Sequence, residues 1–350
     1  MLEIGSEFSF KEINAPIYNN FPANKGACLT YSGRSSIFAV LQDILKQRAI
    51  NGAWLPSYCC SSMLQPFNDL NIPIQFYAVN WNPQDGIVRT HFVPQTGEIV
   101  LLLAYFGFED MGKDFVFHAC QEQCVPLIED CTHCLLSQKR APQITDYRVA
   151  SLRKWFPLAS GGAVWKRDGA IERMSQTPDK HIIALRREAM EEKARYLCAG
   201  IDDPALKQDF LEKYRYCNRA FENNYQNISI DSWSAYELRR QNVHDIRAAR
   251  RRNVAVLLYG LCEIPEVRPL FASLQVNDCP LFVPIFAEQR DELQQWMAQH
   301  SIYCPAHWSK PNEDARSNLY ESELSLICDQ RYGTAEMERI LQVLKDFYKR

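Results

Sequence analysis

The chain has 350 residues, of which 47% are hydrophobic and 12% aromatic, enough for a packed core and more than a single domain usually holds. Its formal net charge is −3, with acids and bases interspersed, which argues against nucleic acid or an anionic membrane as the main partner. No apolar stretch approaches the roughly 18 residues of a membrane span. Residues 1–20 lack the apolar core of a signal peptide, so we expect a cytoplasmic protein.

The sequence has 13 cysteines, scattered through apolar segments. In a reducing cytosol we expect buried thiols rather than disulfides. Cys131 and Cys134 have the spacing of a zinc-binding pair, with Cys120, Cys124 and His118 upstream. The sequence has no second matched pair of short spacing, so a zinc-stabilised structural protein is the remotest alternative.

Apolar runs alternate with helical patterns along the chain, which is typical of a mostly parallel sheet with helices on both faces. A strand–helix–strand–helix pattern near the C-terminus indicates a smaller α+β domain. We therefore predict an α/β fold with a large domain over residues 1–235 and a small domain over 236–350. The expected helices are 35–47, 61–70, 115–123, 183–197, 205–216, 233–258 (one helix or a pair), 290–299 and 334–348, and the expected strands are 53–56, 74–79, 98–105, 125–128, 147–151, 162–165, 279–285 and 323–328.

A lysine and an aspartate follow two of these strands. Lys154 comes three residues after Ser151 and shortly before Gly161-Gly162, and Asp130 closes the apolar run Leu127-Ile128-Glu129. Ligands of parallel sheets bind beyond the carboxyl ends of the strands, so we expect these side chains to share one site. An amine that forms a Schiff base and a carboxylate against a pyridine nitrogen are the two groups that pyridoxal 5′-phosphate (PLP) requires. The sequence therefore predicts a PLP enzyme.

Two further groups could serve the same cofactor. Gly33, Arg34 and Ser35 open the first predicted helix, and backbone N–H groups at a helix N-terminus bind phosphate. Ordinary capping by Ser35 is the alternative there. His133 follows Asp130 by three residues and could orient that aspartate or contact the 3-oxygen of the ring. A structural role for the histidine is its alternative.

Taken together, the segments resemble the DegT/StrS family of sugar aminotransferases, which are fold-type I PLP enzymes. The likeness runs in order over nearly the whole chain, and the order is more specific than any one segment. It rests on Ser32-Gly33-Arg34-Ser35, Leu55-Pro56-Ser57-Tyr58, Phe76-Tyr77-Ala78-Val79, Leu102-Leu103-Ala104-Tyr105-Phe106-Gly107, Ile128-Glu129-Asp130-Cys131-Thr132-His133, residues 151–164 and Leu324-Ser325-Leu326.

The resemblance implies a homodimer with the active site at the subunit interface. It also implies amino transfer, usually from glutamate, to a keto sugar that is typically nucleotide-linked, in surface-polysaccharide or secondary-metabolite synthesis. Lys154 would form the Schiff base and shuttle a proton, and Asp130 would hold the ring nitrogen. Ser151 and the backbone of 33–35 would hold the phosphate. Asn227 would match the asparagine that reaches the phosphate from the neighbouring subunit.

The chain departs from the family pattern at several positions. Cys60 stands where many relatives have the aromatic residue that stacks on the ring, which would leave stacking to Tyr58, Tyr105 or Phe106. Serine precedes the lysine by three residues rather than five, and the family's Asn-Tyr-Arg motif is not recognisable. These departures keep two alternatives open: amino transfer to a smaller phosphorylated or amino-acid-like ketone, and a catalytically inactive PLP-fold protein that binds or regulates a partner.

Overall fold

A computed structural model describes residues 3–10, 12, 16–21, 26–138, 145–200 and 203–350. Its contacts group the chain into two compact units, neither of which is continuous in sequence. The first unit comprises residues 1–3, 7–47 and 147–243, and the second comprises 4–6, 48–146 and 244–350. The predicted division at residue 235 is a different partition and stays a prediction.

Three antiparallel strands form the sheet of the first unit. The central strand pairs Gly162 with Thr30 on one side and with Ser151 on the other. The helix that follows the first strand packs on the other two and buries its apolar side chains, among them Val40 and Leu41. In spatial order the strands are β2 (Cys28–Thr30), β10 (Gly162–Lys166) and β9 (Tyr147–Ser151), and the helix is α1 (Gly33–Gln47).

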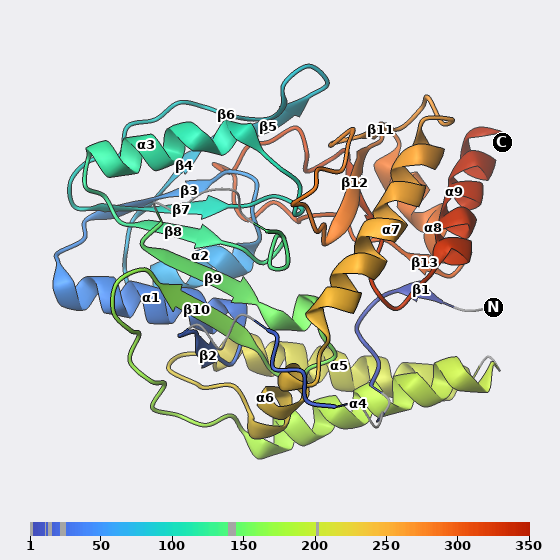
Figure 1. Ribbon diagram of the computed structural model, residues 1–350, viewed down its shortest axis with the longest axis horizontal. Coiled ribbons are helices and arrows are strands. Elements are labelled where there is room, and N and C mark those ends of the chain that lie inside the picture. The colour runs from blue at the N-terminus through green and yellow to red at the C-terminus, as the bar shows by residue number, and fades with distance from the viewer. Residues whose placement is uncertain (1–2, 11, 13–15, 22–25, 139–144, 201–202) are drawn as a thin grey trace. The chain divides into compact units, whose positions relative to one another are not determined.

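Two long helices of the first unit, α4 (Lys180–Ala199) and α5 (Pro204–Asn223), lie side by side (Figure 1). The shorter α6 (Ser232–Arg239) follows them in the chain. An aspartate precedes each of the three helices and accepts a hydrogen bond from a backbone N–H of the first turn, which is the preferred way to satisfy those orphan donors. The three capping residues are Asp179, Asp203 and Asp231.

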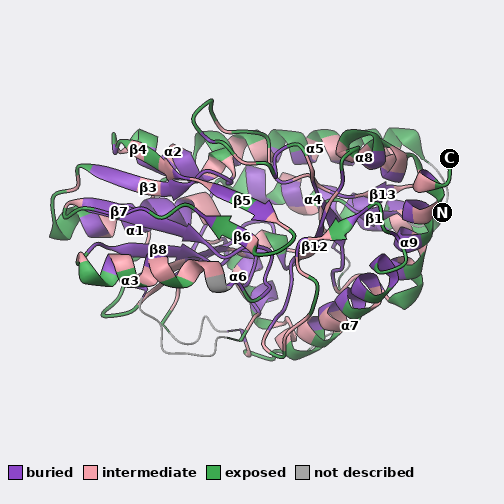
Figure 2. Cartoon of the chain, turned by 90° about the horizontal axis from the view of Figure 1, so that it is seen from above, coloured by how far each residue is buried: buried purple, intermediate pink, exposed green. Residues whose placement is uncertain are grey.

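Four parallel strands form the main sheet of the second unit, and in Figure 2 they are coloured as buried over most of their length except for the edge strand Ile74–Tyr77, where only Tyr77 is buried. The side chains of the three inner strands are mostly apolar, as expected for a parallel sheet that is covered on both sides. In spatial order the strands are β8 (Leu127–Asp130), β7 (Glu98–Leu103), β3 (Gly52–Pro56) and β4 (Ile74–Tyr77). The accompanying helices are α2 (Ser61–Asp69), the 3₁₀ turn η2 (Met111–Lys113) and α3 (Asp114–Glu122).

The remainder of the second unit is built from short strands and three amphipathic helices. A hairpin joins β5 (Val79–Asn82) to β6 (Gly86–Arg89), and β1 (Ile4–Gly5) pairs in parallel with β13 (Ile302–Tyr303). A three-stranded antiparallel sheet has the order β11 (Arg268–Pro269), β12 (Phe282–Phe286) and β14 (Glu323–Ile327). The helices are α7 (Val243–Leu261), α8 (Arg290–Gln299) and α9 (Thr334–Tyr348).

The predicted helices and strands are present, with most ends shifted by only a few residues. Two details differ from expectation. The strands of the first unit are antiparallel, whereas the parallel arrangement holds among β8, β7, β3 and β4. The segment 233–258 is a pair of helices, α6 and α7. Within the described part of the chain, no helix is both long and apolar enough to span a bilayer.

Candidate functional site

Lys154 lies in the loop that joins the neighbouring antiparallel strands β9 and β10. The loop leaves the sheet at Ser151 and returns at Gly162, which is the pairing partner of Ser151. The N–H of Leu152 donates to the carbonyl of Gly161 at 3.0 Å, which closes the loop at its base. The lysine belongs to the 3₁₀ turn η3 (Leu152–Lys154) at the start of this excursion. Its position is therefore fixed by the backbone of the sheet rather than by a long mobile connection.

Apolar side chains anchor the loop on either side of the lysine. Leu152, Trp155 and Phe156 are fully buried, whereas Lys154 is exposed in the single chain. The turn bonds from Trp155 N and Phe156 N to the carbonyl of Leu152, 3.0 and 3.1 Å, fix the direction in which the chain continues. Burial of both aromatic rings thus holds the lysine outward, where a ligand can reach its amine.

The N-terminus of α1 lies against Ser151. A Cβ atom on Gly33 would come within 3.0 Å of the Ser151 Cβ, so the glycine allows this close approach. A Cβ on Gly162 would lie 2.2 Å from the carbonyl oxygen of Ser32, which explains the second glycine of the pair after the lysine. Ser32 rather than Ser35 caps the helix, because the Oγ of Ser32 accepts from the N–H of Ser35 at 3.2 Å. Helix N-terminus and serine together form a cradle suited to phosphate.

Arg34 contributes its backbone, not its guanidinium, to this cradle. The Nη1 of Arg34 donates to the carbonyl of Phe221 at 3.2 Å, and the guanidinium lies over the ring of Tyr225. Arg153, the neighbour of the lysine, stacks 4.1 Å above the ring of Phe221. Burial, and secondly the charge of Arg186, lower the pKa of Arg153 to about 9. The cradle therefore lies beside a cluster of arginines in the first unit.

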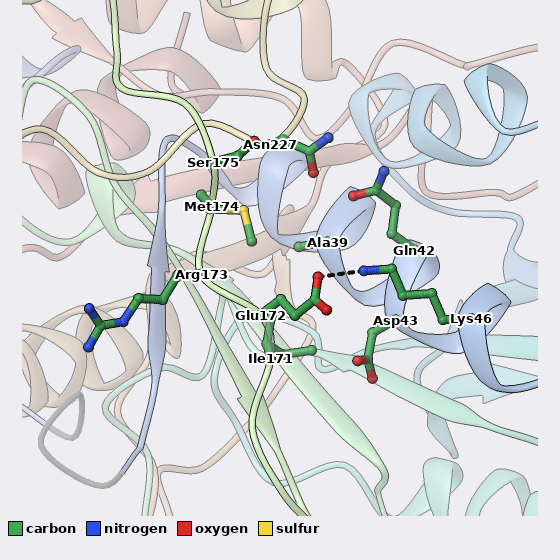
Figure 3. A pocket seen from close by; sticks show the side chains of 10 residues that line it. All are labelled: Ala39, Gln42, Asp43, Lys46, Ile171, Glu172, Arg173, Met174, Ser175 and Asn227. Atoms are coloured by element: carbon green, nitrogen blue, oxygen red, sulfur yellow. Dashed lines mark hydrogen bonds and ion pairs between the residues drawn. The ribbon is translucent and has the colours of Figure 1, made fainter.

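Asn227 lies elsewhere in the first unit, at the wall of a pocket of about 200 Å³ (Figure 3). Its backbone has a positive φ of 56°, a conformation that asparagine tolerates better than most residues. Gln42 and Lys46 of α1 line the pocket together with the segment 171–175. An ion pair of 2.5 Å joins Lys46 to Glu172. In the single chain Asn227 thus belongs to this pocket, and its reach toward a second subunit stays a prediction.

Asp130 is the last residue of β8 in the second unit and is 7% exposed. Its backbone continues the ladder, with the N–H of Ala104 donating to the Asp130 carbonyl at 3.1 Å. Its Oδ1 accepts from the N–H of Thr132 at 2.7 Å, a local turn that fixes the carboxylate at the carboxyl end of the strand. The aspartate therefore also caps a short turn. That bond engages Oδ1, and a carboxylate can accept several more.

His133 is buried in the second unit, 1% exposed. Its Nδ1 accepts a hydrogen bond from the N–H of Phe106 at 3.3 Å. An imidazole that accepts at Nδ1 is neutral and carries its proton on Nε2. The ring stacks on Trp308, with centroids 5.5 Å apart and planes 25° apart. The histidine is thus held as an Nε2–H donor, the form needed to contact a ring oxygen.

Tyr58 is completely buried and belongs to the packing of the second unit. Its hydroxyl donates to the carbonyl of His307, and its ring contacts Tyr105, Trp308 and Tyr320. Burial raises the pKa of the Tyr58 hydroxyl well above its usual range, and Glu323 raises it further. Cys60 precedes α2 as its N-cap and accepts from the Oγ of Ser62 at 3.1 Å. The residue that stacks on a cofactor ring stays a prediction.

A group in the second unit was not recognised from the sequence. His307, Glu323 and Ser325 are buried and hydrogen-bonded to one another. The sequence predicts a strand over 323–328 and resembles the DegT/StrS family at Leu324-Ser325-Leu326, but it predicts no role for the polar side chains. A signal was present in Glu323-Leu324-Ser325-Leu326, because polar residues at alternate positions of a buried strand require polar partners.

The cysteines and histidines considered for zinc do not form a metal site in the described part of the chain, where no group of three or more His, Cys, Asp or Glu side chains could hold a metal ion. Cys120 and Cys131 are buried thiols. Burial raises the pKa of Cys120 to about 12, which keeps it protonated and unreactive at neutral pH.

Neither a protein-family model nor a curated protein matches the sequence. Solved structures do match. PseC of Helicobacter pylori, an aminotransferase involved in pseudoaminic acid biosynthesis, is 13% identical, with a TM-score of 0.66 over 99% of this chain and 93% of that one. The sugar aminotransferase CalS13 of Micromonospora echinospora is 12% identical, with a TM-score of 0.63 over 95% and 92%. Spr1654 of Streptococcus pneumoniae in its PLP form is 11% identical, with a TM-score of 0.62 over 98% and 92%.

The chain shares the fold of these proteins over almost its whole length. The α/β fold expected from the sequence, that of fold-type I PLP enzymes, is thereby confirmed.

Proposed function

We propose that the protein is a PLP-dependent aminotransferase that transfers an amino group from glutamate to a keto sugar. The observation that carries the proposal is the arrangement around Lys154. Ser151 lies against the N-terminus of α1, and the exposed Lys154 comes three residues later in the chain. Amine and phosphate cradle are thus three residues apart on one rigid segment. The likeness of the fold to sugar aminotransferases supports the same function.

The residues of the first unit fit PLP. The close approach of Gly33 to Ser151 brings a hydroxyl to the backbone N–H groups of a helix start, which together suit a dianionic phosphate. We assign phosphate binding to Ser151 and to the backbone of Gly33, Arg34 and Ser35. The amine of Lys154 would hold the cofactor covalently and would move a proton to and from the substrate carbon.

We assign contacts with the ring of the cofactor to residues of the second unit. When bound, PLP supplies a protonated pyridine ring that withdraws electrons from the substrate carbon. The carboxylate of Asp130 would hold the proton on the ring nitrogen, since an opposite charge favours the protonated form. His133 would donate its Nε2–H to the 3-oxygen, in keeping with the hydrogen bond that its Nδ1 accepts from Phe106.

We further propose a cytoplasmic homodimer in which Asn227 reaches the phosphate of the neighbouring subunit. The sugar is the proposed substrate because PseC and CalS13, which share the fold, are described by pseudoaminic acid biosynthesis and by sugar amination. The sugar substrate follows from this likeness and from the sequence resemblance to DegT/StrS enzymes. The homodimer follows from that resemblance. A nucleotide attached to the sugar is part of the same proposal.

The test uses the purified protein with added PLP. We expect a visible absorption band that borohydride bleaches, and we expect glutamate to shift this band as the amino group is transferred. Lys154→Ala should abolish the band. Lys180→Ala is the matched control, because Lys180 is an exposed lysine of the same unit at the start of α4.

A colourless wild-type protein in excess PLP would contradict the proposal, as would a Lys154→Ala variant that keeps the band. A band that forms but does not respond to glutamate would leave PLP binding intact and would exclude glutamate as the donor. Conversion of a keto sugar by the glutamate-treated protein, followed by mass spectrometry, would then identify the acceptor.

A further inference from the structure

A line of hydrogen bonds leads from Glu323 through Ser325 to His307 in the second unit. Glu323 and Ser325 alternate along β14, so their side chains lie on the same face, and both are 0% exposed. The Oγ of Ser325 donates to Oε1 of Glu323 at 2.5 Å and lies 2.9 Å from Nδ1 of His307. Oε2 of Glu323 accepts from the backbone N–H of His307 at 2.7 Å. Both carboxylate oxygens are thus used to position one histidine.

Counting protons along this line fixes the form of the histidine. A serine hydroxyl has one proton, and here the carboxylate of Glu323 accepts it. The Oγ of Ser325 can therefore only accept from His307, so Nδ1 carries a proton. In neutral His307 the lone pair is then on Nε2. Among the described residues, none forms a hydrogen bond with this atom.

The two histidines of this region have opposite forms. His133 accepts at Nδ1 and carries its proton on Nε2, whereas His307 carries its proton on Nδ1. Their ring centroids lie 5.3 Å apart at an interplanar angle of 70°. Three further rings surround His307 with centroid distances of 5.0 to 5.7 Å, those of Phe106, Phe282 and Trp308. An apolar surrounding strengthens the hydrogen bonds of the line and the effect of the carboxylate on the ring.

We propose that His307 is a second base of the active site, held by Glu323 through Ser325, which accepts a proton from the ammonium group of the amino donor. The proposal rests on the proposed function and adds a residue to it. One N–H bond of the ammonium breaks and a bond between that proton and Nε2 forms, leaving a neutral amine that would be able to replace the amine of Lys154 on the cofactor. The imidazolium is stabilised by Glu323 and returns the proton to solvent when the product leaves.

Glu323→Gln tests the line with almost no change of shape. The amide oxygen must face the N–H of His307, so the amide NH₂ faces Ser325 and donates to it. Ser325 then turns its proton to Nδ1, and the proton of His307 moves to Nε2. The variant should therefore convert His307 from the Nδ1–H tautomer to the Nε2–H tautomer. Nitrogen NMR of histidine-labelled protein measures this directly and does not depend on bound cofactor.

Function is measured on the holoenzyme as the rate of the glutamate half-reaction. With Nε2 protonated, His307 cannot accept a proton, so we expect Glu323→Gln to slow the half-reaction at least about tenfold, with a smaller change in the glutamate concentration at half saturation. His307→Gly should slow it about 10²-fold, and added imidazole should restore part of the rate. Glu321→Gln, an exposed glutamate two residues from Glu323, is the matched control.

Each outcome decides the proposal. An Nε2–H form in the wild type would overturn the hydrogen-bond line, and an inverted form in Glu323→Gln with an unchanged rate would overturn the role as a base. Loss of the visible band in Glu323→Gln would indicate a structural role instead and would contradict the proposal. A wild-type protein without a band would refute the proposed function itself, and with it the base, while the NMR result would still report on the line.

Discussion

Two loops carry residues to which we assign a role in the proposed function, and they are held in different ways. The loop 152–161 is closed by its own strands, since Ser151 pairs with Gly162 and Leu152 bonds to Gly161. The loop that carries His307 is held by side chains that come from far along the chain, the hydroxyl of Tyr58 and the carboxylate of Glu323. The first arrangement is local and leaves a motif in the sequence. The second depends on residues that meet only after folding.

The largest effect is expected from substitution of Asp130. It tests whether this residue acts on the cofactor or only holds the local turn. Asp130→Asn keeps an oxygen that can accept from the N–H of Thr132 but removes the charge. We expect both Asp130→Asn and Asp130→Ala to keep the visible band and to lose turnover by several orders of magnitude. Steady-state kinetics checks this. Normal turnover in Asp130→Asn, with loss only in Asp130→Ala, would assign the residue to the turn alone.

Tyr58→Phe breaks the long-range support of the second loop. The carbonyl of His307 loses a buried donor, so we expect the free energy of unfolding to fall by about 1–3 kcal/mol. Urea denaturation measures this, with Tyr259→Phe as control because Tyr259 is 79% exposed. Since phenylalanine keeps the aromatic ring and could still stack on the cofactor, the wavelength of the visible PLP band should not change. An unchanged stability would show that the hydroxyl does not hold the loop.

Gly33→Ala disturbs the local support of the first loop. The added Cβ would lie 3.0 Å from the Cβ of Ser151 and would push the helix start away from the serine. We expect PLP to bind about tenfold more weakly, a loss of about 1.4 kcal/mol. Titration of the visible band gives the dissociation constant. The control is Gly333→Ala, which should bind PLP normally, because its new Cβ would be 3.6 Å from the nearest atom, a side-chain oxygen of Glu336. If Gly33→Ala and Gly333→Ala bind PLP with equal affinity, the phosphate does not bind in this cradle.

Glu7→Gln gives the smallest effect and concerns the arginines beside the lysine. Burial raises the pKa of Glu7, but Arg186, Arg153, Asn218 and Lys193 together lower it below its usual value. The carboxylate therefore stabilises the fold above the ordinary pKa of about 4.3, and this contribution is lost as the pH falls through the lower folded value. Because Glu7 is partly exposed, we expect less than about 1 kcal/mol.

The comparison of wild type and Glu7→Gln by urea denaturation at about pH 6 and about pH 3 checks this contribution. The wild type should lose more stability than the variant between the two values. Parallel losses would mean that the arginines do not act on this carboxylate.

The main elements and the local part of the site could be predicted from the sequence. Helical and strand periodicity placed the helices and the longer strands, because the burial of one face imposes its period on the chain, but it did not predict the short strands β1, β2, β5, β6, β11 and β13. The lysine, its serine and the paired glycines lie within residues 151–162, so their spacing could be read directly. The helix start was misjudged by two residues, since either Ser32 or Ser35 satisfies the rule for a cap and only the structure shows which one accepts.

Which polar residues are buried together became visible only in the folded chain. Arg250, within the helical pattern 233–258, is 1% exposed and donates to the carbonyls of Pro280 and Leu281. Glu323 and His307, separated by 16 residues, are joined through Ser325. Periodicity records which face of an element is apolar, but a buried charge is tolerated only where folding supplies its partners. Those partners are distributed over the chain, so no local sequence pattern predicts them.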